Sequence, residues 1–384
     1  MYANKKNFLI VTASIGSGHN RAAQAIGKEI RSKYPQANIH IVDFMSTKTA
    51  YLNMLLKEAY LAMLNLLPDL YKLLYSWSGG RLKGVSIQTL LALAMKNDMM
   101  HLIKHYQADV VICTHPFPCA AAAYIKKNNK ANILLAGVIT DFAIHQVWVY
   151  KEVDMYFLCN ASMGALLAEK GVESWRIFDT GIPIDTSFTM KYDKHQLAKE
   201  MNLDLNIPIV LVMGGGLGMG GVKMALTALE TLKMKLQVLV VAGENHNLRA
   251  ELRKIAESSK HLVRVWGFSD NIQELMAVAT LLITKPGALT ISEALAMELP
   301  MVLSEPIPGQ EKENAEYIEA TGTALWVKNT NELAKIIEQV ILDNEILTKM
   351  RINARFYKRP YAAKTIVEEI ERYLTNSQNQ VSGM

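Results

Sequence analysis

Residues 209–218 read Ile-Val-Leu-Val-Met-Gly-Gly-Gly-Leu-Gly, an apolar run that ends in a glycine-rich turn. The uninterrupted apolar run predicts a strand that is buried on both faces of a parallel sheet. The glycines allow a tight turn and a close approach of the backbone to a ligand. A helical stretch follows, so the segment predicts the strand–turn–helix unit of a doubly wound α/β domain.

A second pattern of this kind lies near the start of the chain, where an apolar run over 8–13 leads into Gly16-Ser17-Gly18-His19. Further apolar runs, separated by helical stretches, follow in both halves. We expect strands over 8–13, 39–43, 110–114, 133–140, 155–159, 209–213, 238–242, 263–266, 281–284, 301–303 and 324–327. Alternating strands and helices are typical of parallel sheets. The predicted fold class is α/β, with two Rossmann-like doubly wound domains that face each other across a cleft.

The length of 384 residues is enough for two domains. We place an N-terminal domain over 1–185 and a C-terminal domain over 186–355. The remaining residues, 356–384, look helical and could return to pack on the first domain. Open parallel sheets bind ligands at the carboxyl ends of their strands, so the turns after the strands are the candidate sites.

The basic excess of the chain lies in the first domain. Lys and Arg outnumber Asp and Glu by 19 to 13 up to Asp185, whereas the remainder holds 22 basic and 23 acidic residues. This excess is either ordinary solubility charge or the mark of an anionic surface as partner. No apolar run is long enough for a transmembrane helix or placed as a secretory signal, and the three cysteines fit a reducing compartment. We therefore expect a cytoplasmic protein, associated peripherally with the cell membrane.

Residues 52–77 show an amphipathic helical pattern that is interrupted at Pro68. One interpretation is a helical insertion whose apolar face packs in the core. The other is a surface that lies in the lipid interface, with nearby cations meeting anionic headgroups. These cations are Lys57, Lys72, Arg81 and Lys83.

His19 is the candidate base of the first turn. A histidine at a helix start can accept a proton near neutral pH, and the helix amino terminus would lower its pKa and keep the ring neutral. Gly16 and Gly18 would let this loop turn tightly and approach a ligand. A dinucleotide-binding loop stays open as an alternative because Asp43 ends the next strand, although the third glycine is missing.

Three segments of the second half are candidates for a diphosphate site. The glycines after residue 213 suit close approach to a diphosphate, but the Gly-Lys-Ser/Thr of a P-loop is absent. Residues 284–293 predict a helix start whose amides can point at phosphate oxygens, with Glu293 placed for ribose hydroxyls or simply solvated. Residues 306–314 add amide and carboxylate side chains for sugar hydroxyls. No Asp-X-Asp motif occurs, so we expect no metal cofactor and a leaving phosphate stabilised by helix amino termini and Lys285.

Together these segments resemble the monogalactosyldiacylglycerol synthase family and the bacterial processive diacylglycerol glucosyltransferases. The resemblance covers nearly the whole chain. It rests on residues 16–19, 139–148 (Ile-Thr-Asp-Phe-Ala-Ile-His-Gln-Val-Trp), 181–184 (Gly-Ile-Pro-Ile), 285–293 and 308–314 (Pro-Gly-Gln-Glu-Lys-Glu-Asn). It implies a GT-B fold with the acceptor and membrane on the first domain and a UDP-sugar on the second. It also implies inverting, metal-independent transfer at an anionic membrane surface, and no nucleic acid partner.

By position, the resemblance makes His19 the base and gives Asp141 an orienting, assisting or purely structural role. Gly16 and Gly18 belong to the acceptor loop. In the donor site, Glu293 would bind the ribose, while Gln310 and Glu311 would hold the hexose. The full donor set is Gly214, Gly215, Phe268, Gly287, Ala288, Leu289, Thr290, Glu293, Gln310, Glu311 and Asn314.

The reaction that the resemblance implies is transfer of a hexose, more plausibly glucose than galactose, to diacylglycerol. Three alternatives stay open. The first is transfer of GlcNAc to a polyprenyl-linked peptidoglycan precursor, since that transferase shares the architecture. The others are a non-catalytic nucleotide-sugar sensor and a sugar-nucleotide epimerase. The pattern predicts neither the number of sugars transferred nor the oligomeric state.

Overall fold

The computed structural model describes residues 6–14, 17–46, 87–129, 131–144, 146–218, 221–304, 306 and 310–382. The amphipathic segment over 52–77 lies outside these residues, as do Gly16, Arg81 and Lys83. The chain divides into two compact units, Met1–Asp185 with Tyr361–Met384, and Thr186–Pro360. Each unit is described by itself.

The first unit is built on a parallel six-stranded sheet with the order β2-β1-β3-β4-β5-β6. Its strands are β1 (Asn7–Thr12), β2 (Asn38–Asp43), β3 (Val110–Cys113), β4 (Leu134–Val138), β5 (Met155–Leu158) and β6 (Ile177–Asp179). Every residue of β3, β4 and β5 is buried, as expected for strands covered on both faces. The sequence did not predict β6, which has three residues and none of them buried.

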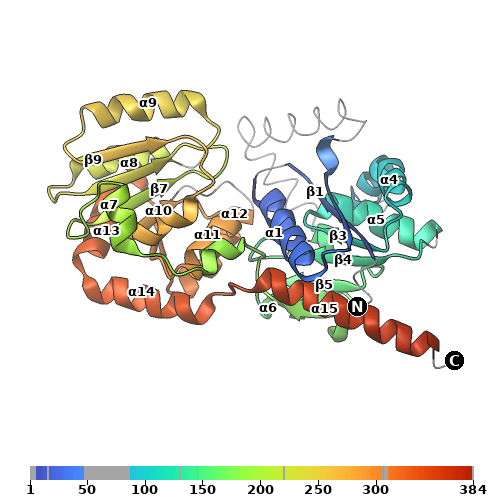
Figure 1. Cartoon of the computed structure of the whole chain (residues 1–384). Helices are drawn as coiled ribbons and strands as arrows, with labels where there is room; N and C mark the ends of the chain where they lie inside the picture. Colours follow the sequence, from blue (N-terminus) through green and yellow to red (C-terminus); the bar gives the residue numbers. More distant parts are fainter. Residues whose placement is uncertain are drawn as a thin grey trace. The chain divides into compact units, whose positions relative to one another are not determined.

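Helices from both ends of the chain cover this sheet. They are α1 (Ser17–Lys33), α4 (Ile87–His105), α5 (Pro116–Asn129), α6 (Ser162–Glu169) and α15 (Ala362–Ser382), with short 3-10 turns η2 (Phe44–Ser46), η3 (Gln146–Trp148) and η4 (Ser174–Arg176). The last helix, α15, lies beside α1 (Figure 1). Ile366, Val367 and Ile370 of α15 are buried in one core with Ile26 and Ile30 of α1. The C-terminal helix is therefore part of the first unit's core.

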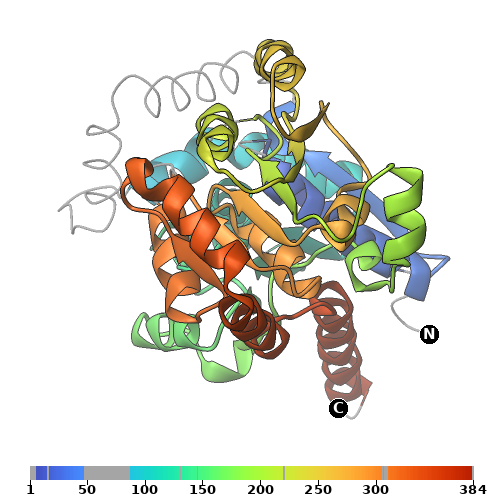
Figure 2. The same cartoon turned by 90° about the vertical axis from the view of Figure 1, so that its left-hand side faces the viewer.

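The second unit holds another parallel six-stranded sheet, with the order β12-β11-β10-β7-β8-β9. Its strands are β7 (Ile209–Met213), β8 (Gln237–Val241), β9 (Leu262–Trp266), β10 (Leu281–Thr284), β11 (Met301–Leu303) and β12 (Ala324–Trp326). The strands expected over 209–213, 281–284 and 301–303 are found at those residues. Helices pack on both faces of this sheet (Figure 2).

The helices of the second unit continue to the point where the chain leaves it. They are α7 (Lys194–Glu200), α8 (Val222–Thr231), α9 (His246–Glu257), α10 (Ile272–Val278), α11 (Ala288–Ala296), α12 (Gln310–Ala320), α13 (Leu333–Leu342) and α14 (Asn344–Tyr357), with η5 (Thr186–Thr189) and η6 (Thr330–Glu332). The chain returns to the first unit at Tyr361 rather than at residue 356. The reason is that α14 continues to Tyr357 and places Leu347 and Met350 in the second unit's core.

Both sheets change winding direction beside their first strand. In the first sheet β1 lies between β2 and β3, and Val11 is level with Cys113. In the second sheet β7 lies between β8 and β10, and Met213 is level with Thr284. At such a switch point the two connections leave towards opposite faces, and ligands of open α/β sheets bind there. The turns after β1, β3, β7 and β10 are therefore the first places to look for a site.

Candidate active site

His19 lies in the first turn of α1, at the switch point of the first sheet. The helix begins at Ser17, so Gly18 and His19 belong to it rather than to the preceding loop. His19 Nδ1 lies 3.0 Å from the Thr114 carbonyl oxygen and 2.7 Å from Thr140 Oγ1. The Thr114 hydroxyl donates to the His19 carbonyl oxygen at 3.1 Å. Residues from the carboxyl ends of two neighbouring strands thus hold the ring.

These contacts select one form of the neutral imidazole. A carbonyl oxygen can only accept a hydrogen bond, so Nδ1 carries the proton and donates it to Thr114. The Thr140 hydroxyl donates to the same carbonyl at 3.3 Å and can accept from Nδ1. The lone pair of the neutral ring therefore lies on Nε2. This is the tautomer in which Nε2 can take a proton from a substrate.

Burial lowers the pKa of His19 from 6.5 to about 4, and the hydrogen bond to Thr114 opposes this shift only in part. The direction agrees with the sequence prediction, but the cause does not. The prediction invoked the helix amino terminus, whereas loss of hydration is the larger effect here. At neutral pH the ring is therefore uncharged.

A second histidine, His115, stands next to His19. The ring centroids are 4.7 Å apart and the planes meet at 82°. His115 is buried, and its Nδ1 accepts a hydrogen bond from the Phe117 amide at 3.2 Å. Burial and, secondarily, the charge of His19 lower the pKa of His115. The site thus contains two neutral imidazoles, of which the sequence motifs pointed to one.

Thr114 and His115 carry no motif of their own, and Thr140 lies in the 139–148 run without having been singled out there. Their signal in the sequence is position, because each follows the carboxyl end of a strand at the switch point. Asp141 is the next residue in this turn and is partly buried. Its carbonyl oxygen accepts a bond from Cys159 Sγ at 3.0 Å. The hydrogen bond that reaches the His19 ring from this turn is that of Thr140.

The glycine-rich turn after β7 is tightly constrained in the second unit. Gly215 and Gly218 have φ angles of +71° and +62°, in the left-handed region that favours glycine. A Cβ on Gly218 would lie 2.1 Å from the Ala242 carbonyl oxygen, so another residue would force the two turns apart. The Gly216 carbonyl accepts from the Glu244 amide at 2.8 Å. The turns after β7 and β8 therefore hold each other in place.

Lys285 and Glu311 form an ion pair over this turn. Their side chains are 17% and 15% exposed, and Lys285 Nζ donates to Glu311 Oε1. The Lys285 Cε would lie 3.2 Å from a Cβ on Gly215, so a glycine at this position leaves room for the lysine. The structure thus brings together three residues from the turns after β7 and β10 and from the start of α12.

The amino terminus of α11 lies at the same switch point. Gly287 is its N-cap and supplies no side-chain cap. The first amides of the helix, those of Ala288, Leu289 and Thr290, can therefore donate hydrogen bonds to an anion. Glu293, one turn further on, is only 3% exposed. The interpretation of Glu293 as a solvated helical carboxylate is therefore wrong.

Asn314 and Gln310 come from α12. Asn314 is fully buried, and its Nδ2 donates to the Pro286 carbonyl at 3.3 Å, which links α12 to the turn before α11. Gln310 is the first residue of α12 and precedes Glu311. Phe268 follows β9 at the same edge of the sheet and is 47% exposed. All predicted donor residues thus lie at the carboxyl edge of the second sheet or on the helices that begin there.

The described ranges also bear on metal binding and on membrane insertion. No group of three or more His, Cys, Asp and Glu side chains is arranged there to hold a metal ion. No helix in the same ranges is long and apolar enough to cross a bilayer.

Comparisons with known proteins agree with this geometry. Residues 19–184 match the model of the monogalactosyldiacylglycerol synthase family, and residues 209–369 match the C-terminal domain of glycosyltransferase family 28. A processive diacylglycerol beta-glucosyltransferase of Bacillus thuringiensis (strain Al Hakam) is 32% identical over 369 residues, which cover 94% of this chain and 92% of that protein. The chain belongs to the glycosyltransferase family that contains the monogalactosyldiacylglycerol synthases and the processive diacylglycerol glucosyltransferases.

Two solved structures show how members of this fold look. MurG of Acinetobacter baumannii superposes with a TM-score of 0.64 at 15% identity, over 96% of this chain and 99% of that one. HepE of Anabaena, in complex with UDP and glucose, superposes with a TM-score of 0.56 at 15% identity, over 97% and 100% of the two chains. The predicted GT-B fold is thereby confirmed for this glycosyltransferase.

Proposed function

We propose that this protein transfers glucose from UDP-glucose to the hydroxyl of diacylglycerol and so makes a glycolipid at a membrane surface. The observation that carries the proposal is the His19 ring, held neutral by burial and turned by Thr114 and Thr140 so that Nε2 is the basic nitrogen. A transferase that acts on an alcohol needs such a base. The relative from Bacillus thuringiensis, a processive diacylglycerol beta-glucosyltransferase, supports the choice of glucose and diacylglycerol.

The second unit supplies the donor site in this proposal. The amides at the start of α11 bind the diphosphate, and the turn at Gly214 and Gly215 lets the phosphates approach the backbone. Glu293 accepts hydrogen bonds from the ribose, and Phe268 lies beside the uracil. Gln310 and Glu311 face the hexose, and the buried Asn314 supports them by holding α12 to the turn before α11. The HepE complex with UDP and glucose supports a nucleotide-sugar site in this fold.

The reaction is a single displacement. The diacylglycerol oxygen attacks the anomeric carbon, and the bond from that carbon to the phosphate oxygen breaks. His19 Nε2 takes the hydroxyl proton, with Asp141 as the alternative or assisting base. UDP leaves with the bonding electrons, and the helix amides and Lys285 stabilise its charge. Attack from the face opposite the leaving group inverts the anomeric centre, so an α-linked donor gives a β-glycoside.

Product analysis tests the proposal directly. The purified protein is incubated with vesicles that contain either diacylglycerol or a polyprenyl-linked peptidoglycan precursor. Separate reactions contain UDP-glucose, UDP-galactose or UDP-GlcNAc, and the lipids are identified by mass spectrometry. We expect a hexosyl-diacylglycerol from UDP-glucose with a β-anomeric proton in its NMR spectrum. A lipid-linked amino sugar formed from UDP-GlcNAc and a polyprenyl acceptor would replace the proposal with the peptidoglycan alternative. Binding of UDP-glucose without UDP release would replace it with a sensor.

A further inference from the structure

The exposed side of α14 combines apolar and cationic side chains. Ile352 and Phe356 are 60% and 76% exposed, and they lie one helical turn apart. Lys349, Arg351 and Arg355 are also exposed. We call these five residues the α14 face. The helix lies on the outside of the second unit (Figure 1).

Helical geometry places the apolar pair between the cations. At 100° per residue, Ile352 and Phe356 form the centre of the exposed stripe, Arg351 and Arg355 border it on one side, and Lys349 borders it on the other. The opposite stripe, which contains Leu347, Met350 and Ala354, is buried. The helix is therefore anchored through one side and presents the other to its surroundings.

Positive charge is concentrated on α14 and on the residues that follow it. Residues 344–364 contain six basic residues and one acidic residue, although the chain after Asp185 has 22 basic and 23 acidic residues. Lys194, at the start of α7, adds a further cation near this helix. Burial and then the charge of Arg351 lower the pKa of Lys194, so these two side chains repel each other. An anionic partner would relieve this repulsion.

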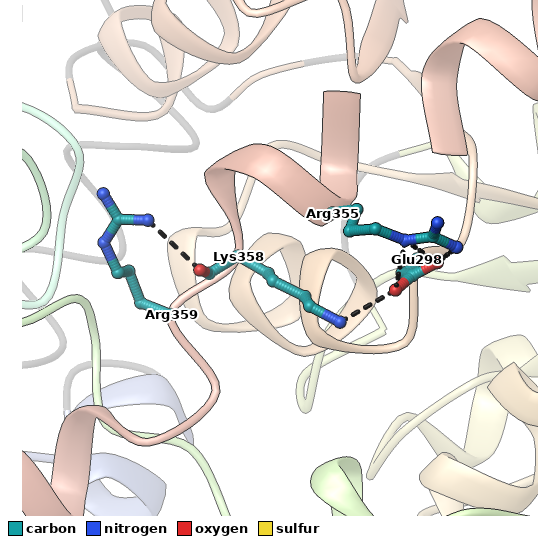
Figure 3. A network of polar contacts seen from close by, with 4 residues as sticks. All are labelled: Glu298, Arg355, Lys358 and Arg359. Atoms are coloured by element: carbon teal, nitrogen blue, oxygen red, sulfur yellow. Dashed lines mark hydrogen bonds and ion pairs between the residues drawn. The ribbon is translucent and has the colours of Figure 1, made fainter. Parts of the chain in front are cut away.

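The end of α14 is held rigidly. Arg355 Nη2 and Lys358 Nζ both donate to the Glu298 carboxylate at 2.8 Å (Figure 3). The hydrogen bonds from Arg355, supported by that from Lys358, lower the pKa of Glu298 to about 2, so the carboxylate stays charged. Arg359 donates to the Phe356 and Lys358 carbonyls at 3.4 and 3.2 Å.

The aromatic side chains at this end are also ordered against each other. Phe356 and Tyr357 meet edge to face with centroids 5.1 Å apart. Arg355 and Phe356 thus contact neighbouring residues, and the α14 face as a whole has an apolar centre and a cationic border.

We propose that the α14 face binds the anionic surface of a lipid bilayer, with Ile352 and Phe356 inserted among the acyl chains and the cations at the headgroups. Large exposed apolar side chains flanked by Lys and Arg are the composition of interfacial helices. The helix projects its apolar pair outward, which suits insertion into lipid. The proposal rests on the proposed function in that the diacylglycerol acceptor resides in such a bilayer.

Vesicle flotation with two pairs of variants tests this surface. The charge variant K349E/R351E is compared with R253E/K254E, which reverses two exposed cations on α9 of the same unit. The apolar variant I352S/F356S is compared with L342S, which removes another exposed apolar residue, 65% exposed, at the end of α13. The vesicles contain phosphatidylcholine with or without phosphatidylglycerol, at low and high salt.

We expect the affinity of both α14 variants for anionic vesicles to fall about tenfold or more. Both controls should bind like the unaltered protein. The charge variant should also lose the salt dependence. Hexosyl transfer to diacylglycerol in detergent micelles should stay unchanged in the α14 variants, so failure of this surface is distinguishable from failure of the proposed reaction. Equal flotation of the α14 variants and their controls, or no flotation of the unaltered protein, would overturn the proposal.

Discussion

The imidazole rings of His19 and His115 meet edge to face, with centroids 4.7 Å apart, at the switch point of the first sheet. His19 Nδ1 donates, since it faces the Thr114 carbonyl, whereas His115 Nδ1 accepts from the Phe117 amide. The two neighbouring rings are therefore opposite tautomers. A proton on His19 is disfavoured by burial, and a proton on His115 is disfavoured by burial and by any charge on His19. The pair is therefore neutral at pH 7.

Replacing His19, the proposed base, should separate catalysis from donor binding. We expect His19→Ala to lower turnover by about a hundredfold or more, the usual contribution of a positioned base. Affinity for UDP should not change, because the donor residues belong to the second unit. Turnover is measured as UDP release with diacylglycerol vesicles, and UDP affinity by calorimetry. The matched control is His246→Ala, which removes an exposed histidine at the start of α9. Near-normal turnover of His19→Ala would remove this residue from the mechanism.

The same two histidines predict how stability changes with pH. Because burial lowers the pKa of His19 from 6.5 to about 4, the unfolded chain binds more protons than the folded chain between these values. The contribution of His19 to the free energy of unfolding is therefore fully present above about pH 6.5 and is lost as the pH drops towards 4. His115, whose pKa is also lowered, acts in the same direction.

A double variant isolates this contribution. His19→Ala/His115→Ala should show a smaller loss of thermal unfolding midpoint between pH 7 and 5 than the unaltered protein, even if its midpoint at pH 7 is lower. The measurement is calorimetric unfolding over that range in buffers of equal ionic strength. Parallel curves for the two proteins would show that the histidines do not titrate differently on unfolding.

Much of the fold was predictable because local patterns and tertiary structure agree. The run over 209–213 is apolar and ends at glycine, and β7 occupies these residues. By contrast, β6 is three residues long with no buried residue, so no pattern marks it. Helix α1 begins at Ser17 and so includes Gly18, which the sequence analysis placed in a loop.

The candidate site was predictable where a residue lies in a glycine-rich turn. His19 was found in this way, whereas His115 and Thr140 were not. The last two become recognisable only once the strand order places the ends of β1, β3 and β4 next to one another. The pairing of Lys285 with Glu311 is likewise a tertiary contact between residues 26 positions apart, and no periodicity predicts it.

The Lys285–Glu311 ion pair predicts that UDP and UDP-glucose respond differently to one substitution. In Glu311→Gln the lysine loses its anionic partner in a mostly buried position, which makes a phosphate a better partner for it. UDP should therefore bind as tightly as before or more tightly. Turnover with UDP-glucose should fall about tenfold or more, because Glu311 is the residue proposed to hold the hexose.

Lys285→Ala provides the contrast. It should weaken UDP and UDP-glucose alike, because the cation proposed to face the phosphates is lost in both complexes. Calorimetry gives both affinities, and thermal unfolding at pH 7 shows whether either variant is misfolded. Equal weakening of UDP and UDP-glucose in Glu311→Gln would contradict the assignment of Glu311 to the hexose.

Two glycines of the second unit, Gly218 and Gly287, should respond differently when changed to alanine. Gly218 has a φ of +62°, and a Cβ there would lie 2.1 Å from the Ala242 carbonyl oxygen. Gly218→Ala should therefore lower the free energy of unfolding by about 2 kcal/mol or more, with donor affinity lost as the turn moves.

Gly287 has a φ of −72°, and Glu311 Oε1, at 4.0 Å, is the nearest atom to a Cβ there. Gly287→Ala should leave the unfolding midpoint nearly unchanged, because neither its backbone nor its neighbours resist a methyl group. Any loss of UDP affinity in that variant then reports crowding of the phosphate at the start of α11, measured by calorimetry beside chemical denaturation. If Gly287→Ala were the less stable of the two proteins, the assignment of strain to the turn after β7 would be wrong.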